Sequence, residues 1–85
     1  MLTIEQARQV RHLLAHAARI LLFTAAHPEL PNRAEYDEQM TIYRAQWATV
    51  PLDERRGIAA QLIADERLGD LTQDAIDTAV AALES

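Results

Sequence analysis

Two histidines lie four residues apart in the segment HLLAH, within the most apolar stretch of the chain. On an α-helix this spacing puts His12 and His16 on the same side, where both imidazoles could bind one metal ion. Two imidazoles do not complete a site, and Leu13 stands where metalloproteases have a glutamate after the first histidine. We expect no metal in a single chain, and keep as an alternative a zinc ion bound by His12 and His16 of two copies.

The surroundings of the two histidines depend on how the first helix pairs with the second. A short loop between the helices favours an antiparallel pair in which residues equally distant from the loop face each other. This register pairs Phe23 with Tyr36, Arg19 with Met40, His16 with Tyr43 and His12 with Trp47. The histidines would then pack against aromatic rings at a helix–helix edge, and a pH-sensitive contact is a second interpretation.

Aromatic residues recur along the second helix at spacings of four and three, in the stripe Tyr36-Met40-Tyr43-Trp47-Val50. Such a stripe either faces the core of a small helical domain or binds another protein, because both roles favour large aromatic side chains. In the second case Arg44 is the expected charged anchor. Arg19 and Phe23, which face this stripe from the first helix, belong to the same candidate surface.

Three short patterns mark the starts of helices. Thr3 and Gln6 have the spacing of a capping box, and Asn32 and Glu35 repeat it. Thr72 is placed to cap the last helix. Helices are therefore expected to begin close to residues 4, 33 and 73.

The ends of the helices are marked by Pro28, which disfavours helical geometry in the residue before it, and by Gly69, a common C-terminal cap. Pro51 suits the first turn of the third helix. No segment alternates with the period of a strand. The predicted fold is all-α, a compact, mostly antiparallel bundle in one domain, residues 1–85, with three longer helices and a shorter fourth at 4–26, 33–49, 51–68 and 73–84.

The first helix has an unusually wide apolar face. Apolar side chains cover an arc of more than about 200°, whereas a surface helix needs only about 100°. Either the other helices surround this helix or a second copy covers what they leave exposed. We expect self-association through the centre of that face, which comprises Val10, Leu14, Ala17 and Leu21.

The composition excludes several kinds of chemistry. The chain has no cysteine and no lysine, and its one serine is the terminal Ser85, so thiol, Schiff-base and serine-triad catalysis have no residues to use. Two glycines are too few for a phosphate-binding loop. We therefore expect neither an enzyme nor a cofactor.

Basic side chains supplied only by arginine, together with abundant alanine, suggest a bacterial or phage source. The longest nearly apolar run, residues 13–26, is shorter than the roughly 20 residues that a membrane-spanning helix needs. The N-terminus does not have the basic-then-apolar order of a signal peptide. A cytoplasmic protein without a membrane segment is expected.

Negative charge is concentrated in the C-terminal part of the chain. Residues 52–85 hold eight acidic residues against three arginines, which accounts for the whole net charge of −5. This excess argues against direct DNA binding. On the last helix the acidic residues share one face, either a solvated surface or a docking surface for a basic target, and the candidates are Asp70, Asp74 and Asp77.

These features predict a non-enzymatic protein-binding module, acting as a regulator, inhibitor or adaptor and forming a homodimer through the first helix. Two alternatives remain open. One is a metal-binding helical protein that uses His12 and His16 across a dimer, and the other is an acidic inhibitor that docks on a basic or nucleic-acid-binding surface.

Overall fold

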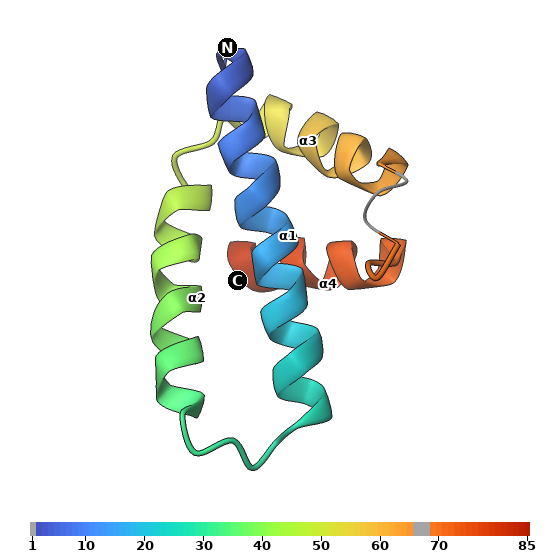
Figure 1. Cartoon of the computed structure of the whole chain (residues 1–85). Helices are drawn as coiled ribbons and strands as arrows, with labels where there is room; N and C mark the ends of the chain where they lie inside the picture. The colour runs from blue at the N-terminus through green and yellow to red at the C-terminus, as the bar shows by residue number, and fades with distance from the viewer. Residues whose placement is uncertain (1, 66–68) are drawn as a thin grey trace.

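A computed structural model describes residues 2–65 and 69–85, and within them the chain forms four helices and no strand. They are α1 (Ile4–Ala26), α2 (Arg33–Trp47), α3 (Leu52–Ala64) and α4 (Gln73–Glu84). Helices α1 and α2 run antiparallel side by side, whereas α3 and α4 run across them (Figure 1). This arrangement confirms the predicted all-α bundle. Within the described part, no helix combines the length and hydropathy needed to cross a membrane.

The capping box at the start of α1 is formed as predicted. The Gln6 amide donates to Thr3 Oγ1 at 3.0 Å, and the Thr3 amide donates to Gln6 Oε1 at 2.9 Å. At the other end the His27 amide donates to the carbonyl of Phe23, and Pro28 follows. The bounds predicted for this helix are therefore confirmed, because the sequence determines both ends locally.

The bounds of α2 and α3 differ from the prediction. Helix α2 ends at Trp47, two residues early, because the Val50 amide donates to the Trp47 carbonyl and closes a turn. Pro51 is the N-cap of α3 and its carbonyl accepts from the amide of Glu54. Helix α3 ends at Ala64, since the next residue has extended backbone, so the prediction that it runs to residue 68 and is capped by Gly69 was wrong. Residues 66–68 themselves lie outside the described part.

The N-terminal caps give a testable contrast between two helices. Thr72 Oγ1 accepts from the Ala75 amide at 3.1 Å, whereas the Asn32 side chain makes no cap hydrogen bond, contrary to the sequence prediction. We expect Thr72→Ala to lower the free energy of unfolding by about 1 kcal/mol, and Asn32→Ala to change it by less than about 0.5 kcal/mol. Urea unfolding followed by circular dichroism measures both. Equal losses in the two variants would contradict the capping geometry.

The core lies where α1 meets the other three helices, since α1 packs against each of them. Leu14 and Ala17 of α1 are completely buried, together with Ala18. Opposite them, α4 contributes Ile76 and Ala79. The wide apolar face of α1 is thus largely explained by the other helices of the same chain, which surround it.

This packing bears on the expected self-association surface. Leu14 and Ala17 have no exposed surface, so they cannot contact a second copy while the chain is folded. Val10 and Leu21 are partly buried and pack against the same core. The four residues predicted to mediate self-association therefore stabilise the single chain, because α2, α3 and α4 already cover the inner side of α1.

Candidate functional site

Trp47, a candidate partner-binding residue, lies in the core. Its side chain is completely buried, and its indole Nε1–H donates to Glu84 Oε1 at 3.1 Å. Met40 and Val50 of the aromatic stripe are buried as well, and Tyr43 is half-buried against the core. Most of the stripe is therefore the inner face of α2, which is the core interpretation of the two that the sequence allowed.

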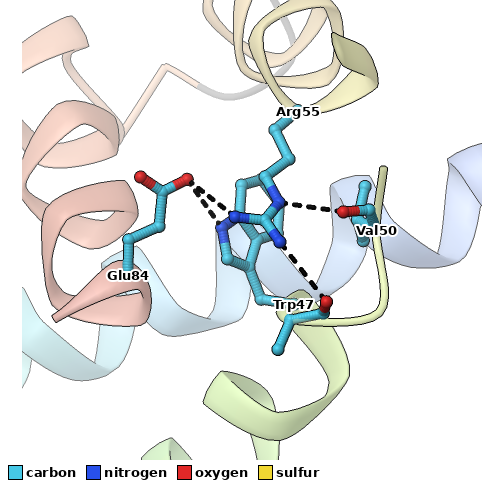
Figure 2. A network of polar contacts seen from close by, with 5 residues as sticks. Trp47, Val50, Arg55 and Glu84 are labelled. Atoms are coloured by element: carbon cyan, nitrogen blue, oxygen red, sulfur yellow. Dashed lines mark hydrogen bonds and ion pairs between the residues drawn. The ribbon is translucent and has the colours of Figure 1, made fainter. Parts of the chain in front are cut away.

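Arg55 completes the polar cluster around the indole, as Figure 2 shows. Its guanidinium donates to the carbonyls of Val50 at 3.0 Å and Ala48 at 3.3 Å, and to Glu84 at 3.4 Å. It also lies 5.8 Å from the centre of the Trp47 ring, within the range of a cation–π contact. The arginine thus binds together the turn after α2, the start of α3 and the end of α4.

Sequence reasoning missed Arg55. Its acceptors are backbone carbonyls in the turn between α2 and α3, and they come within reach only once that turn is folded. Arg44, predicted as an interface anchor, has a similar role, because its Nε–H donates to the carbonyl of Ala82 near the end of α4 at 3.3 Å. Both arginines therefore bond to carbonyls at or after a helix C-terminus, where main-chain donors of the same helix run out.

Phe23 is the aromatic side chain that stays at the surface. It is 42% exposed, and its ring centre lies 5.7 Å from that of Tyr36 and 4.7 Å from that of His27. The predicted pairing of Phe23 with Tyr36 is thus confirmed. We call Phe23, His27 and Tyr36 the aromatic patch. Residues 26–31, at the end of α1 and in the loop that follows, form a shallow pocket that His27 of this patch also lines.

His12 and His16 lie away from α2. Both are exposed and line one open groove with Leu62 and Asp65 from the end of α3. The predicted contacts of these histidines with Tyr43 and Trp47 were wrong. The C-terminal part of α2 instead lies along the Leu13 side of α1, where Leu13 lines a pocket together with Gln46 and Val50 and the two histidines do not.

The arginines on the outer face of α1 are engaged with other side chains. Arg8 forms an ion pair with Glu5 at 2.6 Å, and this pair holds the pKa of that carboxyl below its usual value. The Arg19 guanidinium donates two hydrogen bonds, of 2.9 and 3.2 Å, to the carboxylate of Asp70. The pKa of Asp70 is lowered chiefly by these bonds.

The predicted acidic stripe is divided by these contacts. Asp70 is held by Arg19, which ties the segment before α4 to α1. Asp77 lines a groove beside Arg55 and Arg56, while Asp74 lines a different, mainly apolar groove on the other side of α4. The three carboxylates therefore do not form one continuous unpaired acidic surface.

The described residues contain no group of three or more side chains placed to hold a metal ion. The single serine hydroxyl, that of the C-cap residue Ser85, donates to the carbonyl of Ala82 in the last turn of α4. Comparison with protein-family models, with curated proteins and with solved structures gave no match.

Proposed function

We propose that this chain is a non-enzymatic protein-binding module, a regulator, inhibitor or adaptor that contacts its protein partner through the aromatic patch. The observation that carries the proposal is the position of Phe23. A core phenylalanine would be covered, yet this ring is nearly half exposed while two neighbouring rings fix its orientation.

The geometry of the patch supports binding in two ways. An exposed aromatic ring gains buried area when a partner covers it, and aromatic residues dominate interface hot spots. The contacts of Phe23 with His27 and Tyr36 restrict its side chain before binding, so less conformational entropy is lost on association.

The residue inventory favours binding over catalysis. No thiol or lysine is present, and the one serine hydroxyl caps a helix end rather than meeting a base. The predicted homodimer through α1 belongs to this proposal only in altered form. Because Leu14 and Ala17 are buried within the chain, a second copy would have to use the outward side of α1.

Site-specific cross-linking tests the proposal. A photoreactive phenylalanine derivative at position 23 should give a discrete protein adduct in an EDTA-treated extract of the source cell. The same derivative at Leu52, which is 77% exposed on the far side of the fold, should not give that adduct. Identical adducts from both positions, or none from position 23, would reject the aromatic patch as the contact surface.

A further inference from the structure

The outward side of α1 carries a second feature that the protein-binding proposal does not use. His12 and His16 are one helical turn apart, both exposed, and both line the groove of about 390 Å³ between α1 and the end of α3. Side chains at this spacing have Cβ atoms about 5–6 Å apart, which lets two imidazoles reach the same ion.

The imidazole nitrogens are available for a ligand. Among the residues that the structure describes, neither His12 nor His16 makes a hydrogen bond or a ring contact. The predicted packing of His12 against Trp47, which would have covered its ring, does not occur, because Trp47 is buried and bonds to Glu84 instead.

The arginines around the histidines are held in ways that reduce their repulsion of a cation. Arg8, one turn before His12, is paired with Glu5 at 2.6 Å. Arg19, which follows His16 by three residues, is paired with Asp70 at 2.9 Å. Each of these two positive charges therefore has a compensating carboxylate.

Arg11 lines the same groove, and its guanidinium lies toward α3, because it donates to Gln61 Oε1 at 3.0 Å.

The type of ligand determines which metal ion the site prefers. Imidazole suits zinc, copper and nickel, whereas calcium and magnesium prefer several oxygen ligands, and no such cluster is present among the described residues. Zinc is the natural ion for a site built from histidines alone.

We propose that His12 and His16 bind a zinc ion that is shared by two copies of this chain. One chain supplies two ligands, and zinc takes four in a structural site. A two-fold axis through the ion brings the same turn of α1 from a second chain and completes a tetrahedral set of four imidazoles. The outward position of both histidines leaves this turn open to a second copy.

Molar mass measured by size exclusion with light scattering tests this inference. In EDTA the chain should run at the monomer mass of 9.5 kDa, and one zinc ion per two chains should double that mass. Calorimetry should give the same stoichiometry of one ion to two chains. A chain that stays monomeric with zinc, or binds one ion per chain without association, would overturn the shared site.

Histidine variants show which side chains hold the ion. Both His12→Ala and His16→Ala should lose the zinc-dependent dimer and weaken zinc binding by about tenfold or more, with unchanged far-ultraviolet circular dichroism because both residues are exposed. The third histidine provides the matched control. His27→Ala, which removes an imidazole at the far end of α1, should keep the dimer, and loss of the dimer there would contradict the assignment.

Because the cross-linking of position 23 is done in EDTA, the two proposals can fail separately. A chain that binds no zinc would contradict the shared zinc site and not the protein-binding proposal. A chain that gives no adduct from position 23 would contradict the protein-binding proposal and not the zinc site.

Discussion

Replacing Trp47 with alanine should lower the free energy of unfolding by about 3–5 kcal/mol, the largest effect of any single substitution that we expect. A chain of this length is stable by about 4–13 kcal/mol, so this loss removes a large fraction of the free energy of unfolding. The physical reason is that the indole is completely buried and contributes one of the largest side chains to the core. Urea unfolding followed by circular dichroism at 222 nm measures the change.

Trp47→Phe separates packing from hydrogen bonding at the same position. It keeps most of the ring and removes the Nε1–H that donates to Glu84. Because Glu84 is exposed and still bonds to Arg55, we expect a smaller loss of about 1–2 kcal/mol. Wild-type stability in the alanine variant would mean that Trp47 is not in the core.

Replacing Arg55 with alanine should also have a large effect, a loss of about 2–3 kcal/mol in the free energy of unfolding. The substitution removes three donor contacts, to the carbonyls of Ala48 and Val50 and to the carboxylate of Glu84. The side chain of Arg55 is only 15% exposed, so water replaces these bonds incompletely. Chemical unfolding monitored by tryptophan fluorescence reports the loss, because Trp47 lies beside the guanidinium.

The adjacent arginine is the matched control for this prediction. Arg56 is exposed, and we expect Arg56→Ala to change stability by less than about 0.5 kcal/mol. Arg55→Lys should give an intermediate loss, because one ammonium group cannot reproduce the planar fork of a guanidinium. If the two alanine variants were equally stable, the cluster in Figure 2 would not contribute to folding.

The parts of the fold that the sequence predicted correctly are those controlled by local chemistry. The capping box of Thr3 and Gln6 and the cap at Thr72 fix the starts of α1 and α4, and Pro28 fixes the end of α1. Each of these signals acts over three or four residues, so no tertiary contact is needed to interpret it.

The end of α3 shows what local signals miss. Gly69 is a good C-terminal cap, yet the helix stops earlier at Ala64 with no proline or glycine nearby. The chain then leads to Asp70, which Arg19 holds against α1, and α4 packs on α1, α2 and α3. Tertiary contacts of this kind can end a helix before its local cap, and a single sequence does not display them.

The residues of the candidate sites could be named from the sequence, but only some of their contacts with other helices could be predicted. Helical periodicity placed His12, His16 and Phe23 on one side of α1, which was predicted to face α2, whereas the structure leaves all three exposed. Periodicity did not show which neighbour covers which side, so the pairing succeeded for Tyr36 and failed for Trp47. The angle at which α2 crosses α1 decides this, and it depends on side-chain packing along the whole contact.

The affinity of the chain for the protein that cross-links to position 23 is the most direct test of the proposed function. Calorimetry in EDTA should show that Phe23→Ala binds at least about tenfold more weakly than the wild type, a loss of about 1.4 kcal/mol or more in binding free energy. Leu52→Ala should bind like the wild type. Equal affinity of the Phe23→Ala variant would contradict the claim that the aromatic patch is the surface through which this protein acts.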